Sequence, residues 1–367
     1  MKTLDDLRKE INQVDQELTT SFEKRMELVK KIIDYKIKHN LAVFDESREK
    51  QVLENTLAYL KDENLKEYQQ AFMKETMNLS KSFQTKILNQ NNIAFQGQFG
   101  AFSHLAAKDL FPYHQLKNYL TFNDIFQALK KDETHFGVLP LENSYYGEIG
   151  DILDLLMADD LFINASYDLK VSHHLMGLKG CKLSEIKEVY SHPQAISQCS
   201  TFLKGLNVKV ISYPNTALAA ALILENKDPT LAAIASLASA ELFNLEILAE
   251  NIHDYADNFT RFVVVSKHHN QSGKYASLLF TTKHQSGALN QILSIISNYG
   301  FNLESIKSRP YHQAAWSYYF YLELDIENQI DKYQDLVREL KLSGGVVKNL
   351  GIYNRKDDTS PLNLTYY

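Results

Sequence analysis

Residues 4–36 read LDDLRKEINQVDQELTTSFEKRMELVKKIIDYK, and this stretch decides how the N-terminal part of the chain folds. Residues 3–40 contain neither glycine nor proline. Apolar residues recur at alternating spacings of three and four, which is the pattern of a coiled-coil seam; they are Leu4, Leu7, Ile11, Val14 and Leu18. A helix over this stretch would be about 57 Å long. Because one small domain cannot cover so long an apolar stripe, we expect a partner helix from a second copy, and hence at least a dimer.

Charged and polar side chains interrupt this seam and its continuation in two further predicted helices, at about residues 46–60 and 66–88. A single such residue would more often fix the register of a coiled coil. Several cations that converge on one helical core are costly to bury unless an anion binds among them. The residues concerned are Arg8, Arg25, Lys36, Asp45, Arg48, Glu49, Ser80 and Gln84. Together they predict a binding site for a small polyanion.

Composition narrows the classes of function. The chain has 367 residues, a formal net charge of -6 and only two cysteines. The negative charge argues against a nucleic-acid partner, and two cysteines do not make a disulfide framework. The N-terminus lacks the apolar core of a signal peptide, and the longest apolar run, near residues 217–224, is far shorter than a membrane span of about 20 residues. We therefore expect a cytoplasmic enzyme with no membrane partner.

The pattern changes after the polar linker at residues 89–92. Short apolar strands then alternate with helices, which predicts an α/β domain with largely parallel sheets. Beyond a second polar linker, the order strand–helix–strand–strand–helix–strand predicts a ferredoxin-like α+β unit. We expect four segments: helical residues 1–89, α/β residues 93–267, ferredoxin-like residues 276–354, and a polar, frayed tail at residues 355–367.

Polar clusters mark strand ends in the α/β segment, at residues 97–104, 139–144, 191–195 and 258–262. Ligands bind at the carboxyl ends of strands in open α/β folds, and helix N-termini there suit anions. Each cluster alone has a structural explanation; His192 before Pro193, for example, suits a helix start. The adjacent histidines at 173–174 and 268–269 lack the spacing of metal ligands. We predict neither a metal nor a cofactor.

The first 89 residues resemble the helical chorismate mutases. The resemblance rests on residues 7–11, Leu-Arg-Lys-Glu-Ile, and on the polar seam residues named above. It implies that Arg8, Arg25 and Arg48 hold the two carboxylates of chorismate. It also implies that one arginine comes from the partner chain, in agreement with the long first helix.

The other polar residues take their roles from the same resemblance. Lys36 and Gln84 would donate to the ether oxygen of the breaking bond. Glu49 and Asp45 would bind the region of the ring hydroxyl, with Ser80 nearby. The reaction is an intramolecular rearrangement, so fixed donors in a dry pocket would hold the reactive conformer and stabilise charge that develops on the ether oxygen.

Residues 93–267 resemble prephenate dehydratases. The matching stretches are residues 93–107, 137–147, 191–202 and 258–265. The run Thr260-Arg261-Phe262 is the most specific motif. The resemblance implies two α/β subdomains with the site in the cleft between them, as in periplasmic binding proteins. It also implies that Thr260 assists departure of the ring hydroxyl of prephenate; a threonine hydroxyl is a weak acid, so positioning decides its value.

Further residues are candidates for this cleft. Arg261 would hold a substrate carboxylate if its side chain faces the cleft, although it could equally face the other side of the strand. Glu142, Asn143, Ser191 and Gln198 are further substrate-binding candidates. His192 stays open between a structural role and a place in the site.

Residues 276–354 resemble an ACT domain, a module that binds amino acids and transmits inhibition. The segments at the effector-binding positions comprise Gly287, Ala288, Leu289 and Asn290, and then Ser308, Arg309 and Pro310. The chain departs from the family at Asn290, where an aliphatic residue is usual, and at Lys307, where a glutamate is usual. A cation at 307 would oppose an ammonium group. Phenylalanine is thus the expected effector, and a dimerisation module with a degraded site is the alternative.

The three resemblances together imply a bifunctional chorismate mutase/prephenate dehydratase of phenylalanine biosynthesis. Such an enzyme takes chorismate through prephenate to phenylpyruvate. Two alternatives remain. One is a dehydratase whose mutase module only dimerises, and the set of seam residues argues against it. The other is an amino-acid sensor without catalysis, which the Thr260–Phe262 motif argues against.

Overall fold

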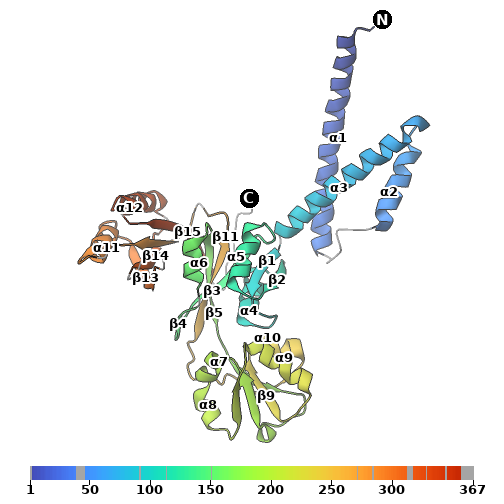
Figure 1. Ribbon diagram of the computed structural model, residues 1–367. Helices are drawn as coiled ribbons and strands as arrows, with labels where there is room; N and C mark the ends of the chain where they lie inside the picture. The colour runs from blue at the N-terminus through green and yellow to red at the C-terminus, as the bar shows by residue number, and fades with distance from the viewer. Residues whose placement is uncertain are drawn as a thin grey trace. The chain divides into compact units, whose positions relative to one another are not determined.

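The computed structural model describes residues 2–38, 46–90, 92–112, 114–149, 151–270, 272–282, 285–311, 317–327, 329–343 and 345–356 (Figure 1). Asp45, predicted to bind substrate, lies outside these residues. The chain divides into two compact units, Met1–Asn91 and Asn92–Tyr367, which are taken in turn. Among the described residues, no helix combines the length and apolarity needed to cross a bilayer.

The N-terminal unit consists of helices α1 (Leu4–Lys38), α2 (Glu46–Ala58) and α3 (Lys66–Gln90), with a 3-10 turn, Glu63–Leu65, before α3. A capping box starts α1: the Thr3 hydroxyl accepts from the Asp6 amide at 3.2 Å, and the Asp6 carboxylate accepts from the Thr3 amide at 3.0 Å. The three helices therefore form where the sequence predicts them.

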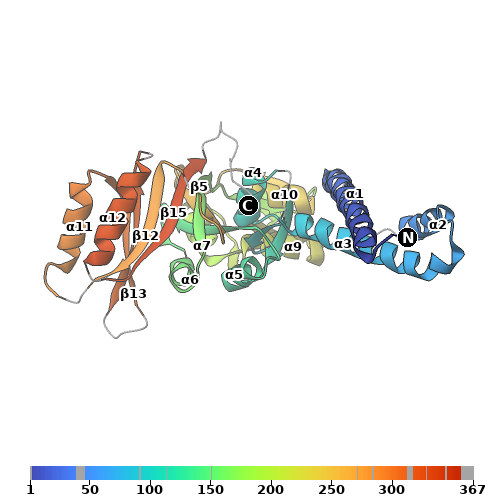
Figure 2. The same cartoon turned by 90° about the horizontal axis from the view of Figure 1, so that it is seen from above.

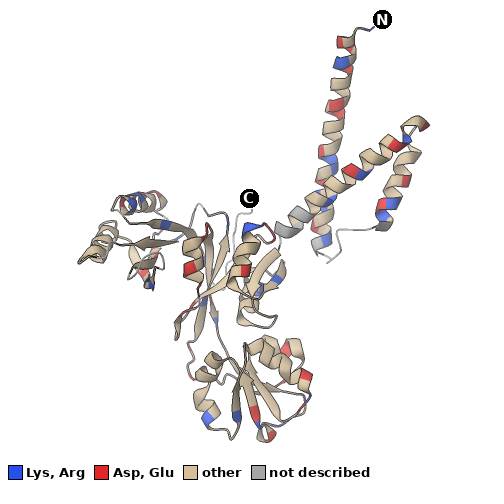
Figure 3. Cartoon of the chain, viewed as in Figure 1, with Lys and Arg blue, Asp and Glu red and all other residues tan. Residues whose placement is uncertain are grey.

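Burial along α1 is uneven. Ile33, in its C-terminal half, is fully buried, and α3 crosses this half in Figure 1. In the N-terminal half, by contrast, Leu4 is 64% exposed, Ile11 61% and Val14 54%. Acidic and basic residues lie along the whole helix in Figure 3. Within one chain, half of the apolar seam thus faces solvent.

The second unit contains two sheets. The strands that build the first subdomain are β1 (Asn92–Gln96), β2 (Gln115–Tyr119), β3 (Phe136–Asn143), β4 (Gly147–Glu148), β5 (Phe162–Lys170) and β11 (Phe259–Ser266). Its helices are α4 (Phe102–Leu110), α5 (Phe122–Lys130) and α6 (Ile152–Ala158). The strand order runs β5-β11-β3-β1-β2, and the core lies between the sheet and these helices, around Phe95, Phe126 and Val263.

The second subdomain is a sheet of order β10-β6-β9-β7-β8. Its strands are β6 (His174–Gly177), β7 (Glu188–Ser191), β8 (Lys209–Ser212), β9 (Leu231–Ala235) and β10 (Glu246–Ala249). Its helices are α7 (Pro193–Gln198), α8 (Ser200–Lys204), α9 (Thr216–Asn226) and α10 (Leu237–Phe243), with a 3-10 turn at Leu183–Glu185. Asn215 caps α9 by accepting from the Leu218 amide at 2.7 Å. The chain enters this subdomain after β5 and returns to the first sheet at β11.

Both sheets are mixed, which corrects the prediction of largely parallel sheets. β1 pairs in parallel with β2 and β3, but β11 is antiparallel to both β3 and β5, and β6 is antiparallel to β9 and β10. β5 does not follow an apolar pattern because it buries polar residues that find partners inside. Asn164, for example, donates to the Ser266 hydroxyl of the neighbouring strand β11 at 2.9 Å.

The C-terminal part of this unit has the predicted order β12 (Tyr275–Thr281), α11 (Ala288–Asn298), β13 (Asn302–Pro310), β14 (Tyr318–Asp325), α12 (Ile330–Leu342) and β15 (Val347–Lys356). Figure 2 shows α11 and α12 together on one side of the strands β12 and β15. Alternate residues of β12, such as Leu278 and Phe280, pack in one core with residues of these helices. β15 pairs with β12 and then, through residues 354–356, with β5, so one sheet continues into the first subdomain. Arg355 and Lys356, assigned to the tail from sequence, lie in this strand.

Candidate functional site

The first candidate site lies in the helical unit, around Arg25 of α1. Its guanidinium donates to the Ser80 hydroxyl and, at 3.4 Å, to the Thr76 carbonyl, both on α3. Burial lowers the pKa of Arg25. No carboxylate among the described residues forms an ion pair with it. A half-buried cation without a counter-charge suits an anionic ligand.

A cavity of about 400 Å³ opens beside Arg25. Its walls come from both long helices and are mostly apolar: Leu18, Thr19, Ser21, Phe22, Arg25, Phe72, Met73, Thr76 and Leu79. Gln84, one turn beyond Ser80, is buried, and its Oε1 has no hydrogen-bond partner in the part of the chain that the structure describes. The helical core thus offers a charged wall, an apolar cavity and a buried carboxamide.

Arg8, another predicted mutase residue, does not lie beside Arg25 within one chain. Arg8 is exposed and pairs with Asp5 at 3.3 Å; it lies about 25 Å along the helix from Arg25, at 1.5 Å per residue. Arg48 is exposed and donates to Gln51 at 2.6 Å, and Glu49 pairs with Lys81 at 3.0 Å. Lys36 is half-buried on α1. A single copy therefore holds only part of the predicted set together.

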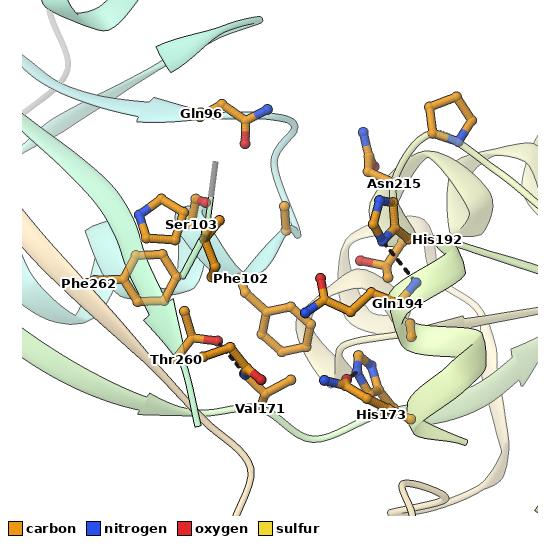
Figure 4. Close-up of a pocket in the computed structure, with 18 of the residues that line it drawn as sticks. Gln96, Phe102, Ser103, Val171, His173, His192, Gln194, Asn215, Thr260 and Phe262 are labelled. Atoms are coloured by element: carbon orange, nitrogen blue, oxygen red, sulfur yellow. Dashed lines mark hydrogen bonds between the residues drawn. The ribbon is translucent and has the colours of Figure 1, made fainter. Parts of the chain in front are cut away.

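The second candidate site is a cavity of about 290 Å³ between the two subdomains (Figure 4). The first subdomain contributes Gln96, Ala101, Phe102, Ser103, Phe122, Pro140, Asn143, Ile149, Thr260 and Phe262. The second subdomain and its connection contribute Val171, His173, His192, Gln194, Ala195, Gln198, Pro214, Asn215 and Thr216. Segments that follow β1, β7 and β8 all reach the cavity, as expected where ligands bind at carboxyl ends of strands.

Thr260 and Asn143 form the hydrogen-bonded centre of the first wall. The Asn143 amide donates to the Thr260 Oγ1 at 3.1 Å and to the Asn258 Oδ1 at 2.8 Å. The Asn143 Oδ1 in turn accepts from the backbone amides of Tyr145 and Tyr146, at 3.1 and 3.2 Å. Asn143 is therefore fixed in orientation. Because Thr260 accepts from it, the threonine proton is left to donate to an occupant of the cleft.

The opposite wall carries His192 and the pair His173–Gln198. His192 caps α7, and its Nδ1 accepts from the Gln194 amide at 3.3 Å, so it has a structural role and also lines the cavity. His173 Nε2 lies 2.6 Å from Gln198 Oε1. Burial lowers the pKa of His173 to about 4, so the imidazole is neutral at physiological pH. The sequence predicted Gln198 as a residue of the cleft but not His173, because the adjacent histidines 173–174 were considered only as possible metal ligands.

Three other candidates for this cleft do not line the cavity. Side chains alternate along a strand, so Thr260 and Phe262 face the cavity and Arg261 faces the other side of β11. There Arg261 binds both oxygens of Asp168, at 2.8 and 3.0 Å, and also contacts Glu142 at 3.2 Å. Neither Arg261 nor Glu142 lines the cavity. The bonds to Asp168 raise the pKa of Arg261.

Ser191 is the third such residue. It is fully buried at the end of β7 and donates to the Ile234 carbonyl at 2.7 Å. That bond joins β7 to β9 behind the wall of the cavity, and Ser191 does not line the cavity. Its role is therefore to hold the strands that carry His192.

Arg261 belongs to a charge cluster that joins the first subdomain to the C-terminal strands. Glu323 of β14, only 1% exposed, accepts from Arg261 and Arg355, each at 3.0 Å. Lys307 of β13 pairs with Glu142. Arg309 pairs with Glu148 at 2.6 Å and Asp154 at 2.5 Å. The cation at 307 thus neutralises a carboxylate of the first subdomain.

The remaining predicted effector residues lie at two places. Gly287, with φ +80, precedes α11, where Ala288 is buried, Leu289 half-buried and Asn290 exposed. On β13, Ser308 and Pro310 are exposed and flank Arg309. Arg309 is engaged by carboxylates, so these two segments present backbone and small side chains rather than a cation.

Two family models match the chain in succession. Residues 7–85 match chorismate mutase type II, and residues 93–270 match prephenate dehydratase. The helical unit and the two-lobed cleft therefore define the class: a prephenate dehydratase preceded by a type II chorismate mutase domain.

Similar proteins agree with this class. A bifunctional chorismate mutase/prephenate dehydratase of Aquifex aeolicus is 32% identical over 362 residues, which cover 96% of this chain and 98% of that protein. The chain belongs to the family of bifunctional chorismate mutase/prephenate dehydratases. A prephenate dehydratase of Arthrobacter aurescens, solved with L-Phe, gives a TM-score of 0.67 at 26% identity, over 75% of this chain and 93% of that one. GqqA, described as a quorum-quenching acylase, also gives 0.67, at 28% identity over 72% and 98% of the two chains.

Proposed function

We propose that the chain rearranges chorismate to prephenate in the helical unit and converts prephenate to phenylpyruvate in the cleft. The observation that carries the proposal is the match to both family models on one chain, combined with the Asn143–Thr260 pair in the cleft. Both reactions run on small dianions, and both sites offer fixed donors in largely apolar surroundings.

In the mutase reaction, Arg25 and the buried Gln84 are the parts of the site that one copy supplies. Arg25 holds a carboxylate, while Gln84 and Lys36 donate to the ether oxygen as its bond breaks. Arg48, Glu49, Asp45 and Ser80 complete the contacts with the substrate. No group needs to exchange a proton, because the rearrangement is intramolecular.

Arg8 reaches this site from a second copy. It lies about 25 Å from Arg25 on the same helix, and the apolar stripe between them is exposed. Antiparallel pairing of this stripe with its counterpart in a second copy would bury Leu7, Ile11 and Val14. The same pairing would bring Arg8 of each copy towards the other copy's Arg25. A homodimer is therefore the catalytic form of the mutase.

In the dehydratase reaction, the Thr260 hydroxyl donates to the leaving ring hydroxyl. Loss of carbon dioxide supplies the electron pair that expels the hydroxide, and the ring becomes aromatic. Asn143 fixes the Thr260 oxygen, and Gln198 donates from the opposite wall. Arg261 and Glu142 hold β11 and β3 in place from the other face of the sheet.

The ferredoxin-like residues 276–354 form an ACT-type module that binds phenylalanine. Its backbone at residues 287–290 and at Ser308 receives the amino acid, while Lys307 and Arg309 keep their carboxylate partners. A relative was solved with L-Phe, which favours this effector. Inhibition of the dehydratase by phenylalanine is the expected readout.

A time course tests the proposal. Purified protein receives chorismate alone at neutral pH, and prephenate and phenylpyruvate are followed together. We expect prephenate first and phenylpyruvate after a lag. Persistent chorismate with turnover of added prephenate would leave only a dehydratase, and phenylalanine binding without either turnover would leave a sensor.

A further inference from the structure

His173 is a buried wall residue of the cleft, on the segment between β5 and β6 (Figure 4). Only 2% of it is exposed, and Phe102 meets its ring edge-on at 5.4 Å between centroids. A buried imidazole is costly unless it is hydrogen-bonded. The partner of each ring nitrogen therefore indicates what the residue does.

The partner of Nε2 is the carboxamide of Gln198, whose Oε1 lies 2.6 Å away. Gln198 ends α7 and lines the cleft. Its backbone carbonyl accepts from the Asp254 backbone amide at 2.7 Å. The Gln198 Nε2 makes no hydrogen bond with any described residue. With Oε1 held by His173, both N–H groups of the carboxamide are left for an occupant of the cleft.

The other ring nitrogen decides the tautomer. Nδ1 of His173 is buried and has no partner among the residues described. Buried N–H groups without an acceptor are rarer than under-satisfied acceptors, so the proton belongs on Nε2. Burial lowers the pKa of His173 and keeps the ring neutral, and the neighbouring His253 and His174 oppose its protonation as well. His173 is thus a fixed donor to Gln198.

We propose that His173 is a positioning residue for the dehydratase reaction, which locks the Gln198 carboxamide with its N–H donors facing the cleft. The inference rests on the proposed dehydratase function. Prephenate carries two carboxylates, a ketone and a leaving hydroxyl, all of which accept hydrogen bonds. A carboxamide turned by 180° would present its oxygen to these groups and repel them.

Two substitutions separate the hydrogen bond from the packing. His173→Phe keeps a ring against Phe102 but removes the donor, whereas His173→Gln places an amide N–H near the position of Nε2. With prephenate as substrate, we expect His173→Phe to lose on the order of tenfold to a hundredfold in kcat/KM, and His173→Gln to stay within about threefold of the native chain. Thermal unfolding of each variant, followed by circular dichroism, checks that the fold is retained.

A double variant tests whether the two residues act through one another. In a Gln198→Leu background, His173→Phe should cause no further loss, because its target is already gone. Because the imidazole stays neutral, the kcat/KM of the native chain and that of His173→Gln should depend on pH in the same way between pH 6 and 8.5.

Full activity of His173→Phe would overturn the proposal. So would an equal loss in a folded His173→Gln variant, or losses that add in the double variant. A native chain that forms no phenylpyruvate from prephenate would instead overturn the proposed function, and the two failures are therefore distinguishable.

Discussion

The cleft and the helical unit differ in how their polar residues are brought together. In the cleft, Asn143, Thr260, His173 and Gln198 come from segments far apart in the chain, yet hydrogen bonds already hold them in pairs within one copy. In the helical unit, Arg25 and Ser80 meet, but Arg8 points into solvent far along α1. The difference supports the proposal that one site is complete in a single chain, whereas the other is completed by Arg8 of a second chain.

Removal of the Thr260 hydroxyl should have the largest effect. Thr260→Ala is expected to lower phenylpyruvate formation from prephenate on the order of a thousandfold, because the leaving hydroxyl loses its donor. Prephenate formation from chorismate should not change. Thr260→Ser keeps the hydroxyl and serves as the matched control. A parallel loss of both activities in Thr260→Ala would show that the two sites are not separate.

The donors of the mutase site should come next. Lys36→Ala and Gln84→Ala are each expected to lose on the order of a hundredfold in mutase turnover, since each removes a donor to the developing charge. The conversion of added prephenate is the internal control and should be unaffected. Near-normal mutase turnover in both variants would remove this assignment.

The apolar stripe of α1 distinguishes the two regions most clearly. Ile11→Asp places a charge on the stripe, and we expect the dimer to weaken and mutase activity to fall at least tenfold, while the dehydratase activity persists. Gln16→Asp, on the polar side of the same helix, is the matched control. Sedimentation and both assays at one protein concentration measure the effect. A monomeric Ile11→Asp variant with full mutase activity would contradict the account.

Arg261 should matter more for stability than for chemistry. Arg261→Met removes one of the two cations that pair with the buried Glu323 and leaves it with Arg355 and the Tyr353 hydroxyl. We expect the free energy of unfolding to fall by about 1–2 kcal/mol. Arg338→Met removes an exposed pair with Asp335 and should change it by only a few tenths of a kcal/mol, roughly. Chemical denaturation followed by circular dichroism gives both values. If a folded Arg261→Met variant lost dehydratase activity a hundredfold or more, Arg261 would have to contact substrate after all.

The order of elements was largely predictable from sequence, because it depends on local periodicity. The seam of α1, the alternation after residue 93 and the ferredoxin-like order all appear as short-range patterns. The strand β5 was missed, because its polar residue Asn164 is satisfied by Ser266, 102 residues away. Local patterns carry no information about such distant partners.

The residues of the cleft were predictable only where a local motif marks them. Asn143, Thr260 and Gln198 follow from the motifs and line the cleft. Glu142 does not line the cleft, and the face of Arg261 stayed open, because the face of a strand depends on its register against neighbours, which one residue can reverse. His173 was missed because its partner Gln198 lies 25 residues away on another element.

Complementation between two inactive variants tests most directly whether the mutase site is shared between copies. Arg8→Ala and Gln84→Ala are purified separately, allowed to exchange subunits at equal concentration, and assayed for prephenate formation. If each site combines Arg8 of one copy with Gln84 of the other, mixed dimers hold one intact site, and activity should return to about a quarter of the native value. If mixing restores nothing although mixed dimers form, Arg8 and Gln84 serve a site within one chain, and the central contrast between the two regions is wrong.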